Sequence, residues 1–430
     1  MFDSGNHKHW GLGFRTNINT GFRFHVDFGT MNADDRQTGR AFPLVRPWTR
    51  RPSFLSWGIA LSIVLAALFW NPSSKAVAED TCIYEKAVCA ARGSVFRISA
   101  FDPLASAVRV SADKLVTTRH SVADAGTARV FTADGKALTA EVLPSGYTGD
   151  LVLLRVPDLP AGPVLKPEAL RADKLLHTVG TDVRTREAKV YAPGALLFAP
   201  ADGLPLARIH HSAYSQPGTS GGALVDGDGR WVGIVTSGGE GRFEAIPATA
   251  LETLRAATGD EHAAASAETG AAVRVCVTLL EDLRRQRARR MEDQPAKALT
   301  TSCRRSGNRQ LLDLAAQTLG RKGRAEASVA LFEEALEEDP HAVNARIGLA
   351  VSLALARRHE GAVSHLRWLL DGGIEDVQVL RLAIQAGVWG GDEALARRAL
   401  KRIEEINPQM APTARRFVDN PPPKPQPRTR

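Results

Sequence analysis

The chain has 430 residues, of which 44% are hydrophobic and 24% are charged, so it can bury the cores of two or three domains. Its formal net charge is +8, but residues 1–78 hold nine Lys or Arg and four Asp or Glu and therefore carry +5 of it. The remaining +3 is spread over the rest of the chain, which argues against nucleic-acid binding. The sequence has no zinc-type cysteine spacing, His-Glu-x-x-His string or P-loop string, so no metal or cofactor is expected.

An uncharged stretch at residues 53–70 follows three arginines, and the small-x-small string Ala76-Val77-Ala78 comes after it. This order of basic, apolar and small residues is typical of a secretory signal. Eighteen uncharged, mainly apolar residues are also just enough to cross a bilayer as a helix. We expect cleavage after Ala78, with an uncleaved anchor at residues 53–70 as the alternative. Either reading predicts a periplasmic or secreted protein, or one anchored in the inner membrane.

Short β-type runs separated by turn signals extend from residue 94 to about residue 248. The runs include residues 95–98, 114–118, 151–154 and 231–235, and Asp-Gly pairs lie between several of them. Many short strands in such a region predict a barrel or a sandwich. Beyond it, Leu251 and Leu254 are spaced as one face of a helix.

Three strings in this region hold the residue types that nucleophilic catalysis needs. His120 ends one strand-like run, Asp150 opens another, and Ser220 stands in a Gly-Thr-Ser-Gly-Gly string. A serine hydroxyl needs an imidazole as general base, and the imidazole needs a buried carboxylate on its other nitrogen. The backbone N–H groups of Gly218 and Ser220 can stabilise an oxyanion if the loop turns tightly. Each string alone is weak evidence, but the three in this order predict a Ser-His-Asp triad.

These strings resemble the trypsin-fold serine proteases, most closely the HtrA/Deg-like branch, over about residues 93–256. The resemblance implies two six-stranded β-barrels with the triad in the cleft between them. It also implies an oxyanion hole at Gly218 and Ser220, and a strand at Thr236, Ser237 and Gly238 that pairs with the substrate backbone. The sequence departs from the family at Thr219, where Asn or Asp is more usual, and no PDZ domain follows the barrels.

One residue, Tyr214, gives an indication of which substrate side chain is preferred. Tyr214 stands six residues before the serine where a trypsin-like enzyme has an acid, so we expect a small or medium apolar side chain to be preferred over Arg or Lys. His210 and His211 are interpreted as strand residues, because no second carboxylate is placed for them.

Four cysteines in an exported protein favour two disulfides. Cys82 and Cys89 lie seven residues apart, and Cys276 and Cys303 flank an arginine-rich segment. Local pairing is the simplest of the three connectivities, and free buried thiols are the alternative.

Residues 310–408 show a repeat of 34 residues. Small residues recur at Ser328, Ala362 and Ala396, and larger apolar ones follow four positions later in each unit. This resembles the tetratricopeptide repeat, in which small residues let paired helices approach closely. The resemblance implies a short curved array that binds a peptide or a protein partner. A helical stalk or cap that only stabilises the barrels is the alternative.

The sequence therefore predicts a multidomain protein, an all-β double barrel followed by an all-α repeat domain. The expected parts are a leader at 1–78, a protease domain at 79–257, a linker with a basic helix at 258–305, repeats at 306–412 and a Pro-rich basic tail at 413–430. The predicted function is an exported serine endopeptidase that acts on proteins or peptides. An inert protease-fold scaffold working through its repeats is the main alternative, and an esterase-like acyl hydrolase is a weaker one.

Overall fold

The structure is a computed structural model that describes residues 82–286, 288 and 290–426. The leader at residues 1–78, with its expected signal or anchor at 53–70, lies outside the described residues.

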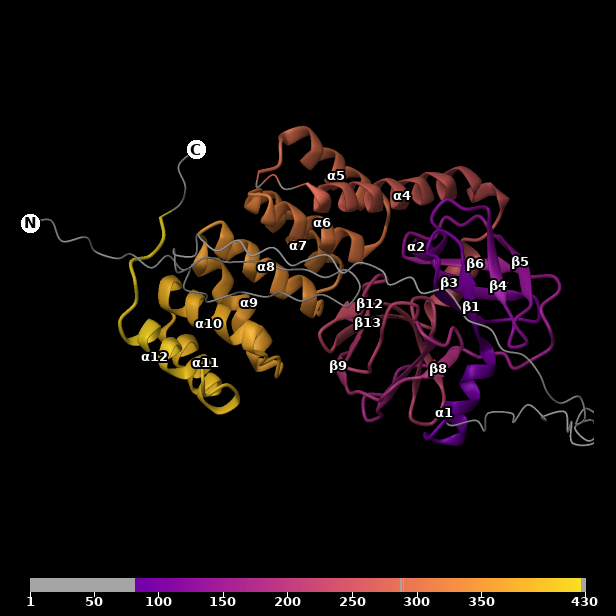
Figure 1. The fold of residues 1–430 in the computed structure, drawn as a ribbon, viewed down its shortest axis with the longest axis horizontal. Helices are drawn as coiled ribbons and strands as arrows, with labels where there is room; N and C mark the ends of the chain where they lie inside the picture. Colours follow the sequence, from indigo (N-terminus) through magenta and orange to yellow (C-terminus); the bar gives the residue numbers. More distant parts are fainter. Residues whose placement is uncertain (1–81, 287, 289, 427–430) are drawn as a thin grey trace, which may run out of the picture. The chain divides into compact units, whose positions relative to one another are not determined.

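The first barrel is closed and has six antiparallel strands in the order β1-β2-β3-β6-β5-β4 (Figure 1). The predicted run at residues 95–98 lies in β1, and those at 114–118 and 151–154 lie in β3 and β6. Apolar side chains such as Ile98, Leu115 and Leu154 fill its interior. The strands are β1 Val95–Ser99, β2 Ala105–Arg109, β3 Lys114–Thr118, β4 Thr127–Phe131, β5 Ala137–Val142 and β6 Leu151–Arg155.

The second barrel is a sheet of seven strands in the order β8-β7-β11-β12-β13-β10-β9. It closes on itself because Leu176 in β7 and Gly194, just before β9, exchange two backbone hydrogen bonds of 2.8 and 2.9 Å. The double barrel is thus confirmed, with seven strands here where six were expected. Pro193, which has no N–H to give to a ladder, separates β8 from β9. The strands are β7 Leu176–Thr181, β8 Ala188–Val190, β9 Leu196–Phe198, β10 Ile209–His211, β11 Ala223–Asp226, β12 Trp231–Gly239 and β13 Arg242–Pro247.

Short helices accompany the barrels, and both predicted disulfides are present. Cys82 is bonded to Cys89, which lies in α1 (Lys86–Ala90), and α2 (Arg119–Val122) follows β3. Leu251 and Leu254 lie buried on α3 (Ala250–Ala256), as their spacing predicted.

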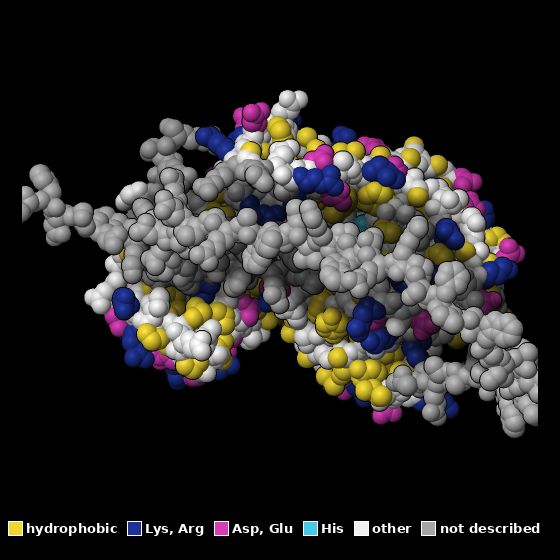
Figure 2. Space-filling model, in the orientation of Figure 1, with side chains coloured by type: hydrophobic (Ala, Val, Ile, Leu, Met, Phe, Trp, Pro, Cys, Tyr) yellow, Lys and Arg dark blue, Asp and Glu magenta, His cyan; other side chains and the backbone are white. Residues whose placement is uncertain are grey.

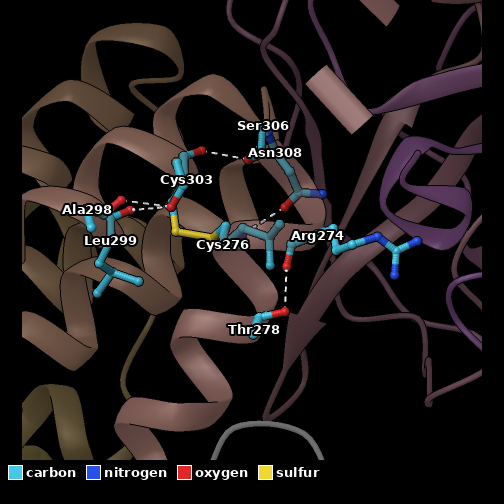
Figure 3. The surroundings of a disulfide bond; sticks show 10 residues. Arg274, Cys276, Thr278, Ala298, Leu299, Cys303, Ser306 and Asn308 are labelled. Carbon is cyan, nitrogen blue, oxygen red and sulfur yellow. Dashed lines mark hydrogen bonds between the residues drawn. A yellow bond between two sulfur atoms is a disulfide. The ribbon is translucent and has the colours of Figure 1, made fainter. Parts of the chain in front are cut away.

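The structure differs in part from the linker with a basic helix that was expected over residues 258–305. This segment forms α4 (Ala263–Arg285) and α5 (Asp293–Arg305), which the Cys276–Cys303 disulfide joins (Figure 3). The many alanines at the start of α4 favour helix, and Val273 and Leu299 are fully buried. By length and composition alone the segment Asp260–Arg285 could cross a membrane, but here α4 packs against α2, α5 and α6.

The C-terminal region is a helical domain in which α6 to α11 form three consecutive helix pairs (Figure 1). The N-cap residues of α6, α8 and α10 are Asn308, Ala342 and Asp376, which are 34 residues apart. The small and large apolar residues of the repeat are buried where paired helices meet. The helices are α6 Arg309–Arg321, α7 Ala325–Glu338, α8 Val343–Leu355, α9 His359–Asp371, α10 Val377–Gly390 and α11 Glu393–Ile406.

The tail expected from residue 413 begins later than predicted. A further helix, α12 (Ala411–Asp419), buries Phe417 against Trp389, with ring centroids 4.9 Å apart. Phe417 thus packs α12 onto the helical domain, which extends this domain by one helix. Residues 421–426, beyond α12, have no regular secondary structure.

A cluster of buried charges joins the second barrel to the helical domain. On the face of the molecule that Figure 2 shows, charged side chains of both signs lie at the surface. The side chains of this cluster, in contrast, are buried. Arg309 at the start of α6 binds Glu244 of β13 at 3.1 Å and Asp339 at 2.7 Å. Arg208 and His210 of the barrel bind the same two carboxylates. Removing one partner of such a network leaves a buried charge uncompensated, so the two domains are held together in one arrangement.

Asp313 on α6 lies beside this cluster with a pKa raised to about 7, because burial, and then the charge of Glu244, disfavours its ionised form. The folded protein therefore binds this proton more tightly than the unfolded chain, and stability falls as pH rises from about 4 towards 7. Asp313→Asn cannot ionise and should melt above the wild type at pH 8, with the difference vanishing near pH 4.

The matched control is Asp339→Asn. Burial tends to raise the pKa of Asp339, but His210 and Arg309 hold it below its usual range. Its charge therefore contributes stability above about pH 4 that is lost as pH falls. This variant should melt below the wild type at pH 8. A lower melting temperature for Asp313→Asn at every pH would show instead that Asp313 is ionised and paired in the folded protein.

Candidate active site

His120 and Asp150 meet because they flank a paired stretch of the first barrel. Thr118 at the end of β3 pairs with Leu151 at the start of β6, so His120 and Asp150 lie just beyond the same end of the ladder. The His120 Nδ1 and Asp150 Oδ2 atoms are 2.7 Å apart. Asp150 Oδ1 accepts a hydrogen bond of 2.9 Å from the His120 backbone N–H, which fixes the carboxylate against the histidine.

The surroundings raise the pKa of His120 and lower the pKa of Asp150. Burial works against the protonated form of His120, but the charge and hydrogen bond of Asp150 outweigh it and raise the pKa of the imidazole. Burial would raise the pKa of Asp150, yet the charge of His120 and its hydrogen bond lower it. Asp150 is 1% exposed and ionised, so it is an acceptor for the Nδ1 proton. The pair is therefore suited to stabilise an imidazolium.

Ser220 reaches this pair through Thr236. The Ser220 hydroxyl donates to the Thr236 backbone oxygen at 3.3 Å, and the Thr236 hydroxyl donates to Asp150 Oδ2 at 3.1 Å. Within the described residues, Ser220 Oγ makes no hydrogen bond to His120. The structure thus joins two of the three predicted residues directly and links the third to them through Thr236.

The loop before Ser220 leaves two backbone donors free. Gly218 has φ +100° and Gly221 has φ +80°, conformations that only glycine adopts readily. A Cβ on Gly221 would also lie 2.2 Å from the Ser106 backbone oxygen. In the part of the chain that the structure describes, the N–H groups of Gly218 and Ser220 donate to no acceptor. They therefore stand ready for a developing oxyanion.

Ser106 of β2, which the sequence reasoning missed, holds this loop in place. Its backbone N–H donates to the Ser220 oxygen at 2.8 Å, and its hydroxyl donates to the Gly218 oxygen at 2.7 Å. The same hydroxyl accepts from the Thr181 N–H at 2.8 Å. Ser106 thus ties the loop of Ser220 to both barrels, and no local sequence pattern marks such a residue.

The expected substrate-binding residues have different environments. Thr236, Ser237 and Gly238 lie at the end of β12, where Ser237 and Gly238 pair with β13. The Ser237 hydroxyl donates to Glu244 at 3.0 Å, so it faces the buried charge cluster. Tyr214 is 49% exposed and contacts Phe243 edge-on.

The two histidines interpreted as strand residues do lie in a strand, β10. However, His210 has carboxylate partners, Asp339 at 2.9 Å and Glu244 at 3.8 Å. The contact with Asp339 could not be expected from the sequence, because Asp339 belongs to the helical domain and lies 129 residues away along the chain. Among the described residues, no group of three His, Cys, Asp or Glu side chains is placed to hold a metal ion.

Residues 105–234 match the family model of the trypsin-like peptidase domain. The Rv3671c protease of M. tuberculosis in its inactive form is 23% identical, with 40% of this chain and 93% of that chain covered and a TM-score of 0.35. The HtrA-type protease AlgW with tripeptide is 29% identical, with 40% and 62% covered and a TM-score of 0.36. A serine endoprotease from Yersinia pestis is 26% identical, with 39% and 62% covered and a TM-score of 0.34.

The chain thus spans less than two thirds of the AlgW and Yersinia chains. No curated protein sequence matches it. The match over residues 105–234 includes His120, Asp150 and Ser220, and with the double barrel it supports a peptidase domain of the serine type.

The raised pKa of His120 gives a prediction for the pH profile of hydrolysis. Only the neutral imidazole can take a proton from serine, so kcat/KM should rise with pH through an apparent pKa above about 6.5. Asp150→Asn removes the charge that raises this pKa. It should move the rise to lower pH and reduce the rate by about 10⁴-fold at its plateau.

Asp102 is the control, because its charge raises the pKa of His120 less than that of Asp150 does. Asp102→Asn should shift the rise in the same direction by less and keep most of the plateau rate. A profile that does not depend on Asp150 would contradict the assignment of the His120–Asp150 pair.

Proposed function

We propose that the protein is an exported serine endopeptidase that hydrolyses peptide bonds through Ser220, His120 and Asp150. The observation that supports this most strongly is the 2.7 Å contact of His120 Nδ1 with the buried, ionised Asp150. It lies beside a serine loop with two unused N–H donors. The substrates would be proteins or peptides.

The geometry supports a two-step acyl transfer. Ser220 Oγ turns from the Thr236 oxygen towards His120 Nε2, gives its proton to that nitrogen and attacks the substrate carbonyl carbon. The N–H groups of Gly218 and Ser220 bind the resulting oxyanion, and Asp150 stabilises the imidazolium. His120 then protonates the leaving amine, and the acyl-enzyme forms. A water molecule then gives a proton to His120 and attacks the ester carbonyl carbon. The carbon–Oγ bond breaks, His120 returns the proton to Ser220 Oγ, and the acid is released with Ser220 and His120 restored.

A catalytically inert scaffold is the second candidate function. The observation that favours a scaffold is that, among the described residues, the Ser220 hydroxyl donates to the Thr236 oxygen and not to the His120 imidazole. In this case the helical domain would carry the function of the protein.

We propose that the three helix pairs of the helical domain are tetratricopeptide-like repeats that recruit a substrate or a partner. Tethering of that kind raises the effective concentration of a substrate without changing the triad.

Ser220→Ala should abolish hydrolysis of an unfolded protein such as casein, because the nucleophile is lost. The turnover rate should fall by about 10⁴–10⁶-fold, as in other triad removals. Thr219→Ser, in the same loop, is the control and should keep most of the activity. A scaffold would leave casein intact in both variants and in the wild type, and unchanged proteolysis by Ser220→Ala would place the nucleophile elsewhere.

Export predicts a mature amino terminus at Glu79 in the periplasm or outside the cell. Mass spectrometry of the protein from its native host reads that terminus directly. An intact segment 53–70 in the membrane fraction would favour the anchor over the cleaved signal. A soluble cytoplasmic protein with an intact leader would contradict export by either route, and so would reduced Cys82 and Cys89.

A further inference from the structure

A residue of the helical domain contacts the candidate catalytic base. Asn308, the N-cap of α6, places its side-chain nitrogen Nδ2 at 3.1 Å from His120 Nδ1. It is 2% exposed and lies 188 residues along the chain from His120. Hydrolysis by the triad, as proposed above, does not account for this contact.

The helix cap that Asn308 makes fixes which end of its amide faces the imidazole. Its oxygen accepts the Leu311 N–H at 2.8 Å and so caps α6, which leaves the NH2 group towards His120. The turn before it is held to the disulfide-bonded helix α5, because the Ser306 hydroxyl donates to the Cys303 oxygen at 2.6 Å (Figure 3). The same hydroxyl accepts the Asn308 backbone N–H.

The turn also lies close to the barrel backbone. Gly307 has φ +58°, and a Cβ on it would lie 2.5 Å from the Thr148 oxygen. Arg309, the next residue, is anchored by Glu244 and Asp339. The residues on both sides of Asn308 therefore hold its amide against His120.

A donor at this position opposes catalysis in either tautomer of the neutral imidazole. Asp150 requires a proton on Nδ1, because an ionised carboxylate only accepts hydrogen bonds. If the Asn308 N–H occupies the Nδ1 lone pair instead, the proton sits on Nε2, which then cannot take the proton of Ser220. If Nδ1 carries its proton, two donors face each other and the imidazolium formed during reaction is repelled. The orientation of Ser220 towards the Thr236 oxygen fits such a restrained base.

We propose that Asn308 is a positioning residue that restrains His120, so that the docked helical domain keeps the peptidase partly latent. This inference rests on the proposed function, since it concerns the base of the same reaction. Activation then corresponds to a shift of the amino-terminal end of α6 away from His120, with the barrels unchanged.

The test uses substitutions that keep the helix cap and change only the group facing His120. Asn308→Ser still caps α6 but lacks the NH2 group, and Asn308→Asp caps it and presents an acceptor. Asp392, the N-cap of α11, accepts from Leu395 and lies on the last repeat pair, so Asp392→Ser is the matched control for a changed cap. Gly307→Ala is a further variant that leaves Asn308 intact and pushes it away from the barrel.

Two measurements on the full chain separate restraint from a structural role. One is hydrolysis of a short peptide, as kcat and KM over a pH series. The other is the ¹⁵N NMR titration of His120, which shows which ring nitrogen is protonated, with His120→Ala used to assign the signal. The charged groups that act on this imidazole are Asp150, Asp102 and Arg208, and all are unchanged in the variants.

Asn308→Ser and Gly307→Ala should raise kcat by about three- to tenfold, the rate equivalent of one hydrogen bond, with little change in KM. The titration midpoint of His120 should rise in Asn308→Ser and rise further in Asn308→Asp, and Asp392→Ser should match the wild type in both. An unchanged or lower midpoint with active enzyme would overturn the restraint, as would a lower kcat in Asn308→Ser. If the midpoints follow the expected order but no variant hydrolyses any peptide, the proposed function fails and the restraint of catalysis fails with it.

Discussion

The contact between His120 and Asp150 is the constraint on which the rest of the site depends. It exists because β3 and β6 pair in one register, and a shift of that register by one residue would separate the two side chains. Thr236, the His120 backbone and Asn308 all converge on this pair. These partners compensate the buried charge of Asp150, since an unpaired buried charge would destabilise the fold.

The buried charges between barrel and helical domain extend this constraint across the molecule. Two arginines, Arg208 and Arg309, face two carboxylates, Glu244 and Asp339. The charges of the two arginines and the two carboxylates balance. Such a cluster adds little net stability compared with apolar packing, but it penalises any arrangement that leaves a member unpaired. Because Arg309 follows Asn308 in the chain, these ion pairs hold the start of α6, and with it Asn308, beside His120.

The sequence allowed the barrel strands, both disulfides and the helical region to be predicted, because each depends on local patterns. Hydrophobic alternation and Asp-Gly turns mark strands, and cysteines close in sequence pair with each other. The placements of His120 and Asp150 at strand ends followed from the same patterns. Only the start of α4 was mistaken for a linker, because this alanine-rich stretch lacks the large apolar side chains that mark a packed helix.

The contacts between domains could not be predicted in this way. The partners of His210 and His120 on the helical domain lie 129 and 188 residues away in sequence, and only the docked fold brings them together. Ser106 was missed for a similar reason, since a single serine in a strand carries no signal of the loop that it holds. Tyr214 was singled out by its distance from Ser220 along the chain, which says little about a side chain that is half exposed.

Covalent labelling tests most directly whether Ser220 is a nucleophile that His120 activates. The full chain is treated with a fluorophosphonate, and the modified peptide is identified by mass spectrometry in the wild type and in His120→Ala. We expect a single adduct on Ser220 in the wild type and a rate of labelling that falls by orders of magnitude without the imidazole. Labelling of another residue, or of Ser220 at equal rates in both proteins, would contradict it.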